Sequence, residues 1–258
     1  MGVTYPVVAP ASTQAPYPGA TDAAIAAWWQ GVRLKRPGWG VPDFFIAVAA
    51  WLVFSIVSGV PILLAQEGTA AYAWLLLVGV ALPWLGMGGW PWLISRLRGN
   101  GMRLDFGLRV TKADIGWGLL FGIGALVAAG LIAAGLTAIF GEFDSSAGEV
   151  ARDLDDFPVA RLLFALAVGF GAPIVEELCY RGLLMSSLLK RGTSRWLSVV
   201  LSAALFAAMH LEPIRFALLF AIGLILGWAR VHRNNTTTAI VAHMTNNMPG
   251  AIGILFLL

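Results

Sequence analysis

Long apolar stretches separated by short polar segments dominate this chain from residue 43 onward. Each stretch is close to the ~20 residues that an α-helix needs to cross the hydrocarbon core of a bilayer. The pattern predicts seven spanning helices, at Phe44–Ala65, Ala70–Ile94, Ile115–Phe140, Pro158–Lys190, Ser194–His210, Pro213–Val231 and Thr236–Leu258. We therefore expect an all-α, polytopic membrane protein whose residues 43–258 form a single transmembrane domain.

The first 42 residues do not follow this pattern. Residues 1–21 are rich in Pro, Ala and Thr, carry no charge and lack the basic start and apolar core of a signal peptide. This composition predicts a disordered tail. Residues 23–32 contain Trp28 and Trp29 and precede a basic run at residues 33–36. That combination is typical of a short helix lying at the membrane surface, with a mobile linker as the alternative.

The composition agrees with a membrane protein. Hydrophobic residues make up 59% of the chain and charged residues 12%, against about 25% charged in ordinary soluble domains. Basic membrane loops account for the net charge of +3, so no nucleic-acid partner is indicated. The single cysteine, Cys179, excludes an internal disulfide and an all-cysteine metal site. We interpret it as a small buried residue and not as a nucleophile.

Charge alternates between successive loops. Basic residues gather before the first span and in the second, fourth and sixth loops, at residues 33–36, 96–112, 190–195 and 230–233. Acidic residues dominate the intervening loops, chiefly at residues 142–156. Because basic loops favour the cytoplasmic side, we expect a cytoplasmic amino terminus and an external carboxy terminus.

The fourth span carries three charged residues, Glu176, Glu177 and Arg181. Each would cost roughly 2.5–3.5 kcal/mol at the bilayer centre unless it is paired. Glu177 and Arg181 are four residues apart and can pair on one helix face. Glu176 lies about 100° further around the helix and has no such partner. Either the group is an internal ion pair that locks the helix, or Glu176 is retained for chemistry.

Two histidines interrupt the later spans. His210 ends the fifth span, while His243 and Asn247 lie four residues apart in the seventh and share a helix face. Counted from the turn near Gly192, Glu176 and His210 lie at one level, roughly 21–24 Å from it. His243 is shallower, so it must reach up or its helix must tilt. A lone buried histidine is usually structural, but two of them beside an unpaired glutamate favour a site.

These residues carry a family resemblance. Glu176-Glu177-x-x-x-Arg181, Phe206-x-x-x-His210 and His243-x-x-x-Asn247 resemble the three ordered motifs of the CAAX prenyl protease and bacteriocin-processing family. The resemblance implies an integral membrane endopeptidase with a catalytic core at residues 157–258, in which a glutamate activates water. It also implies that Glu176, His210, His243 and Asn247 line the site. The substrate would be a protein or peptide at the bilayer, and the family leaves open whether it is lipid-modified or membrane-embedded.

The chemistry of amide hydrolysis suits this set of residues. Hydrolysis needs a base for water, an acid for the leaving amine and donors for the oxyanion. Glu176 can act as base and then as acid, His210 can orient the water, and His243 and Asn247 can donate to the oxyanion. Glu177, paired with Arg181, would tune the electric field around Glu176, and we count it among the candidate catalytic residues.

A metal is left open at this point. Glu176, His210 and His243, with water as a fourth ligand, form the donor set of many catalytic zinc sites. Against zinc, the two histidines lie on different spans instead of four residues apart on one helix. Asn247 is also a better oxyanion donor than zinc ligand. Zinc-assisted hydrolysis and water activation by Glu176 alone are therefore both hypotheses.

Two other classes of protein carry buried acids and histidines. A transporter coupled to protons or cations would use them as relays, but no inverted repeat is evident and the polar residues cluster in the last three-eighths of the chain. A non-catalytic membrane scaffold or immunity protein could keep the same side chains without turnover.

Overall fold

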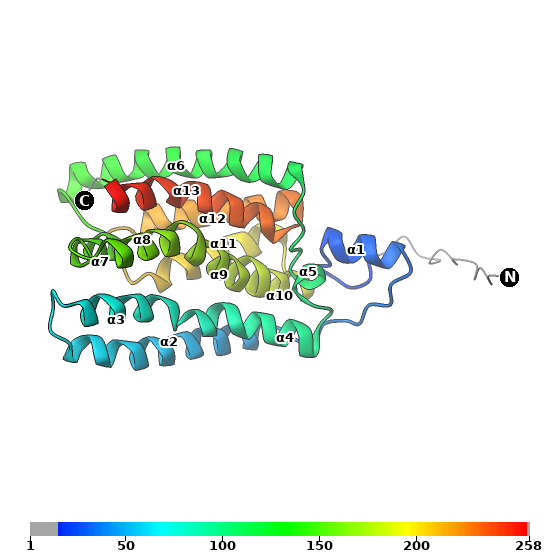
Figure 1. Cartoon of the computed structure of the whole chain (residues 1–258). Coiled ribbons are helices and arrows are strands. Elements are labelled where there is room, and N and C mark those ends of the chain that lie inside the picture. The colour runs from blue at the N-terminus through cyan, green and yellow to red at the C-terminus, as the bar shows by residue number, and fades with distance from the viewer. Residues whose placement is uncertain (1–14, 257–258) are drawn as a thin grey trace.

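Figure 1 shows the computed structural model, which describes residues 15–256 as a bundle of long helices lying side by side. In chain order the α-helices are α1 Asp22–Trp29, α2 Val41–Leu64, α3 Ala70–Ala81, α4 Trp90–Arg98, α5 Met102–Asp105, α6 Lys112–Phe140, α7 Ser146–Asp153, α8 Pro158–Leu166, α9 Ala172–Glu177, α10 Met185–Lys190, α11 Arg195–Met209, α12 Phe216–Arg233 and α13 Thr236–Phe256. Three π-helical turns join some of these segments, η1 Leu85–Gly89, η2 Ala167–Gly171 and η3 Leu178–Leu184. The described residues contain no strand, so the all-α prediction is confirmed.

Five helical stretches of the described chain are long and apolar enough to cross a membrane. They are Val41–Leu64, Ala70–Arg98, Lys112–Phe140, Pro158–Lys190 and Phe216–Arg233. Helix α11 has 15 residues and spans about 22 Å, short of the ~30 Å hydrocarbon core. Helix α13 has the length but is not among the five. The protein is therefore a multi-pass membrane protein, and the count of seven spans stays a prediction.

Lipid-facing surfaces follow the same helices. On α2, Leu63 and Leu64 are more than four-fifths exposed, and on α6 Leu131 and Ile139 are more than two-thirds exposed. In water such continuous apolar surface would be costly, because apolar area drives burial. In a bilayer the hydrocarbon chains are the solvent for these side chains, so these faces do not have to be buried against protein.

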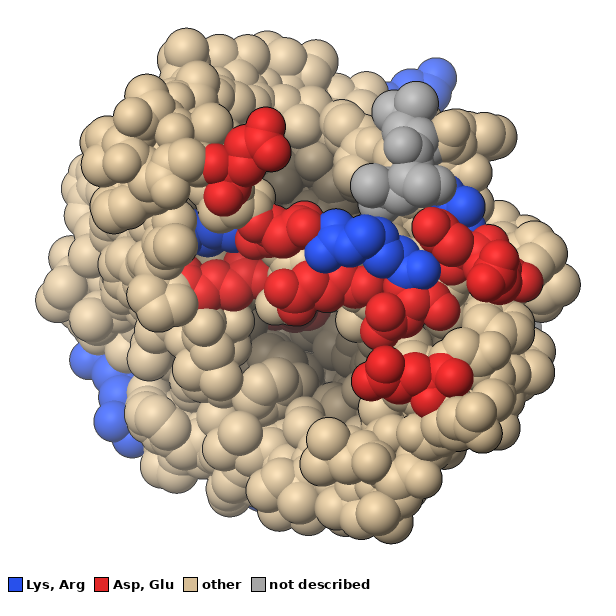
Figure 2. Space-filling model, turned by 90° about the vertical axis from the view of Figure 1, so that its left-hand side faces the viewer, with Lys and Arg blue, Asp and Glu red and all other residues tan. Residues whose placement is uncertain are grey.

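The charged loops separate to the two ends of the bundle. The end that faces the viewer in Figure 2 gathers acidic side chains around a hollow. Contacts at this end include Tyr72 with Asp153, whose oxygens lie 3.1 Å apart, and the ion pair of Asp155 with Arg161 at 3.3 Å. At the opposite end Lys190 and Arg98 meet the segment that precedes α2. The structure thus separates acidic from basic loops as the alternation predicts, and which end is cytoplasmic stays a prediction.

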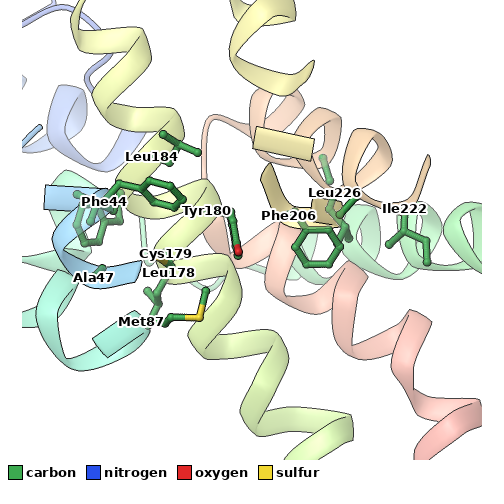
Figure 3. Packing of buried hydrophobic residues seen from close by; sticks show 14 of the residues in the cluster. Phe44, Ala47, Met87, Leu178, Cys179, Tyr180, Leu184, Phe206, Ile222 and Leu226 are labelled. Carbon is green, nitrogen blue, oxygen red and sulfur yellow. The ribbon is translucent and has the colours of Figure 1, made fainter. Parts of the chain in front are cut away.

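A row of aromatic rings forms the centre of the core. The ring centre of Tyr180 lies 5.6 Å from that of Phe44 and 5.5 Å from that of Phe206. Figure 3 shows these rings, which link α2, η3 and α11. Cys179 is fully buried beside them, as expected of a packing residue. The row fixes the fourth span between the amino-terminal helices and the last three.

Glycines allow one close helix contact that the site needs. Helix α6 packs along α13, and a Cβ on Gly122 would lie 2.4 Å from the Cβ of Thr245. Gly118 meets Val241 in the same way. Small residues let helix backbones approach closely in membranes, so α6 lies near enough to form a wall beside His243.

Part of the predicted disordered tail is ordered. The hydroxyl of Tyr17 lies 3.4 Å from Asp105, and the hydroxyl of Thr21 donates to the carbonyl of Leu104 at 2.5 Å. Both side chains are buried, so the prediction of disorder is wrong for residues 17–21, and residues 1–14 lie outside the described residues. Helix α1 also favours the short helix over the mobile linker. The domain boundary at residue 43 stays a prediction.

The separated ends generate a test of orientation. Single cysteines introduced by Arg103→Cys and Asp156→Cys occupy exposed positions at the basic and the acidic end. Because basic loops stay on the cytoplasmic side, an impermeant thiol reagent applied to intact cells should label position 156 and spare position 103. The unaltered chain is the control, since its only cysteine is buried. Labelling of both positions from one side would contradict this topology.

Candidate active site

The fourth span has an irregular backbone around its two glutamates. The short helix α9 lies between the π turns η2 and η3, and Pro173 occupies its second position. Proline removes a backbone N–H and crowds the preceding turn of a helix, and π turns accommodate such interruptions and recur at functional sites. The local geometry therefore places Glu176 and Glu177 on one turn of α-helix between two widened turns.

Glu177 is fully buried in a charged network. Its Oε1 accepts a hydrogen bond of 2.8 Å from Arg181, which is also fully buried. Arg181 donates a second bond of 2.8 Å to the carbonyl of Gly223 on α12 and lies 4.8 Å from the ring centre of Phe206. The predicted pair of Glu177 and Arg181 is confirmed, and it joins the fourth span to α12.

His243 contacts the same carboxylate. Its Nδ1 lies 3.0 Å from Glu177 Oε1, and its Nε2 lies 3.9 Å from Glu176 Oε2. A carboxylate paired with Arg181 accepts hydrogen bonds, so Nδ1 is the donor of this bond, and a neutral imidazole would keep its lone pair on Nε2. The separation of 3.9 Å is too long for a direct hydrogen bond. His243 therefore bridges the buried carboxylate and the space beside Glu176.

Glu176 has a different environment from its neighbour. Its side chain is 23% exposed and lines a cavity of about 610 Å³. His210, His243, Asn246 and Asn247 line the same cavity. The structure thus brings Glu176, both predicted histidines and Asn247 together, while Glu177 and Arg181 lie behind them in the protein interior.

His210 lies at a strained corner. Its Nδ1 is 2.8 Å from the carbonyl of Phe206, so Nδ1 donates, and a neutral imidazole would keep its lone pair on Nε2. The next residue, Leu211, has a φ of 56°, a left-handed conformation that is unfavourable for a bulky side chain. This corner ends α11 at the cavity and fixes the imidazole at its edge.

Asn247 is held from the opposite wall. Its amide nitrogen donates to the carbonyl of Val168 in η2 at 3.0 Å, and its oxygen accepts from Asn246 at 3.2 Å. A side-chain amide has two N–H groups. One N–H of Asn247 is therefore engaged in orienting the side chain, and the second remains for a group in the cavity.

The sequence reasoning missed the outer wall of the cavity. Glu212 and Arg215 line the cavity together with Ser146 of α7, whereas the sequence indicated only loop charges at these positions. Glu212 accepts hydrogen bonds from the backbone N–H and hydroxyl of Ser146 at 2.9 and 2.7 Å, and it pairs with Arg215. Burial alone would raise the pKa of Glu212, but these hydrogen bonds and the charge of Arg215 lower it below the ordinary value. The ionised carboxylate fastens α7 over the site, and only the position of Glu212 two residues after His210 hinted at this.

The candidate zinc ligands do not form a ready-made metal site. Among residues 15–256, no three His, Cys, Asp or Glu side chains are close enough together to hold a metal ion. Glu176, His210 and His243 share one cavity but do not converge on one point. The side chains as placed do not fit zinc, and no step proposed below involves a metal.

The buried network generates a prediction about stability. Arg181→Ala leaves Glu177 ionised and buried beside His243 without its cation, and breaking a buried pair commonly costs about 3–5 kcal/mol. We expect a loss of that size in the free energy of unfolding in detergent. The matched control is Arg195→Ala, which removes an exposed arginine and should change stability little. Equal effects of the two substitutions would show that the network does not stabilise the fold.

A comparison with known proteins finds a match over the carboxy-terminal helices. Residues 158–249 match a family model described as type II CAAX prenyl endopeptidase Rce1-like. No curated protein and no solved structure matches the chain. The match begins at the first residue of α8 and contains Glu176, His210, His243 and Asn247, the residues that the cavity brings together. In this carboxy-terminal helical core, residues 158–249, the chain is similar to the CAAX prenyl endopeptidases.

Proposed function

We propose that this protein is an intramembrane endopeptidase in which Glu176 activates a water molecule to hydrolyse a peptide bond. The observation that carries the proposal is the contrast between two adjacent carboxylates. Glu177 is inaccessible to solvent and paired with Arg181, whereas Glu176 faces a cavity that it shares with two histidines and an asparagine. A structural ion pair explains Glu177 and leaves Glu176 available for chemistry.

The side chains support a balanced sequence of proton transfers. Glu176 removes a proton from water as the water oxygen forms a bond with the peptide carbonyl carbon. The protonated Glu176 then gives its proton to the amide nitrogen as the C–N bond breaks. General acid–base catalysis of this kind contributes about 10²- to 10⁴-fold in rate.

The hydrogen bonds refine the roles of the other residues. As neutral imidazoles protonated at Nδ1, His210 and His243 present Nε2 lone pairs that accept from water and orient it beside Glu176. In this tautomer His243 does not donate to an oxyanion, in contrast to the role expected from the sequence. The second N–H of Asn247 is the donor that suits the developing oxyanion, and its bond to Val168 pre-orients it.

The walls of the cavity indicate what kind of chain would bind. Leu126 of α6 and Leu218 and Ile222 of α12 give it apolar sides, while Ser146 and Glu212 give it a polar end. A segment that enters would therefore place apolar groups between the helices and polar backbone near α7. This suits a peptide at the membrane boundary, either lipid-modified or membrane-embedded.

Substitution of Glu176 tests the mechanism. With a prenylated CAAX peptide as probe in proteoliposomes, Glu176→Gln should lower kcat by at least about 10²-fold, and His210→Ala should also reduce cleavage strongly. The matched control is Glu149→Gln, because Glu149 is an exposed carboxylate on α7 that does not line the cavity. Full activity of the Glu176→Gln protein would refute the proposed role of Glu176. An inactive wild-type protein would refute this class of substrate.

Metal removal tests the remaining chemical alternative. Since the candidate ligands do not converge, we expect protein verified as metal-free by elemental analysis to cleave the probe at the wild-type rate. The competing result is one zinc ion per chain that is lost together with activity in His210→Ala. That outcome would show that the side chains rearrange around a metal during catalysis.

A further inference from the structure

A second cavity lies at the basic end of the bundle, away from the active site. It measures about 430 Å³ and forms where α2 begins and where α4 and α10 end. Its lining includes four cationic side chains, Arg36, Arg98, Lys190 and Arg191, and one carboxylate, Asp43. Such a concentration of like charge in a concave site favours an anionic ligand.

Two of the four cations, Arg98 and Lys190, are already committed to the fold, and so is the carboxylate. Asp43 accepts from the N–H of Gly40 at 2.8 Å and forms an ion pair with Arg98. Lys190 donates to the carbonyls of Pro37 and Trp39, and its ammonium lies 4.1 Å from the centre of the Trp39 ring. Asp43, the one carboxylate among the lining residues, is therefore neutralised by Arg98. Lys190 is held in place by its hydrogen bonds to the segment before α2.

The other two cations are free to bind a ligand. Arg36 and Arg191 have exposed side chains and form no ion pair with the described residues. Guanidinium groups present paired N–H donors that match the oxygens of a phosphate group. Two such groups on different segments, with Lys190 in the same lining, have the chemistry of a phosphate site.

The position of the cavity points to a lipid and not to a soluble phosphate. Ile46, on the spanning helix α2, lines the cavity and is 45% exposed. Phe45 on α2 and Leu97 on α4, each next in the chain to a lining residue, are exposed as well. A phosphate held by the arginines would leave room for attached acyl chains along these side chains. Basic pockets at the ends of membrane helices are known to bind anionic headgroups.

We propose that this cavity binds the headgroup of an anionic phospholipid, with Arg36 and Arg191 as ligands of the phosphate and Lys190 as the charge beneath it. Lys190 is the last residue of the helix that carries Glu176, 14 residues earlier. The bound lipid would connect the end of the catalytic helix to the segment before α2. Binding to the folded state alone would also stabilise the protein by mass action.

The test uses delipidated, full-length protein and native mass spectrometry. Phosphatidylglycerol should bind more tightly than phosphatidylcholine with the same acyl chains. The double variant Arg36→Gln with Arg191→Gln should bind phosphatidylglycerol roughly thirtyfold more weakly, the loss expected for two charge contacts. The matched control is Arg33→Gln with Arg195→Gln, which removes the same charge from exposed positions outside the cavity and should bind like the wild type.

Several outcomes would overturn the proposal. Equal loss in the two double variants would show a diffuse charge effect, and equal binding of the two lipids would show that only acyl chains matter. Glycerophosphoglycerol, the headgroup without acyl chains, is the soluble probe, and binding as tight as that of the lipid would assign the site to a soluble phosphate. A second pair, Arg36→Lys with Arg191→Lys, keeps both charges and must keep the preference for phosphatidylglycerol.

Discussion

A charge that leaves water must find its counter-charge inside the protein, and the fold is arranged around that requirement. Arg181 and Glu177 are both inaccessible to solvent, and neither would be tolerated alone in a low-dielectric interior. Their bonds reach the carbonyl of Gly223 and the imidazole of His243. One ion pair therefore joins the fourth span to α12 and α13, and it holds His243 beside Glu176.

The same arrangement explains why two neighbouring glutamates differ so sharply. A rotation of about 100° per residue takes one side chain into the interior and the next to the cavity. The cavity lies close to an acidic end fastened by Glu212, whereas the basic cavity lies at the far end of the same helix. The span Pro158–Lys190 is thus held by the side chains of Arg161 near one end, Arg181 near its centre and Lys190 at the other end.

Local features of the chain could be predicted from the sequence, and long-range contacts could not. The helices and the pair of Glu177 with Arg181 follow from hydropathy and from a spacing of four residues. The order of residues 17–21 depends on Asp105, which is 88 positions from Tyr17, and no local pattern encodes that contact. The bond of Ser146 to Glu212 joins residues 66 positions apart, so α7 could not be recognised as a wall of the site. The bond of His243 to Glu177 also joins residues 66 positions apart, so the donor role of Nδ1 could not be predicted.

The π turns on either side of α9 have a consequence for how this helix tolerates change. A π turn holds one more residue than an α turn between the same hydrogen-bonding groups. Deleting one residue from η2 or η3 would therefore restore a regular α turn there, with little change in the orientation of the helix on either side. A deletion within α9 has no such turn to absorb it and would rotate one side of the span by about 100° against the other. The direction of the Glu176 side chain is therefore sensitive to an insertion or deletion in α9, whereas apolar substitutions in the π turns leave the number of residues unchanged.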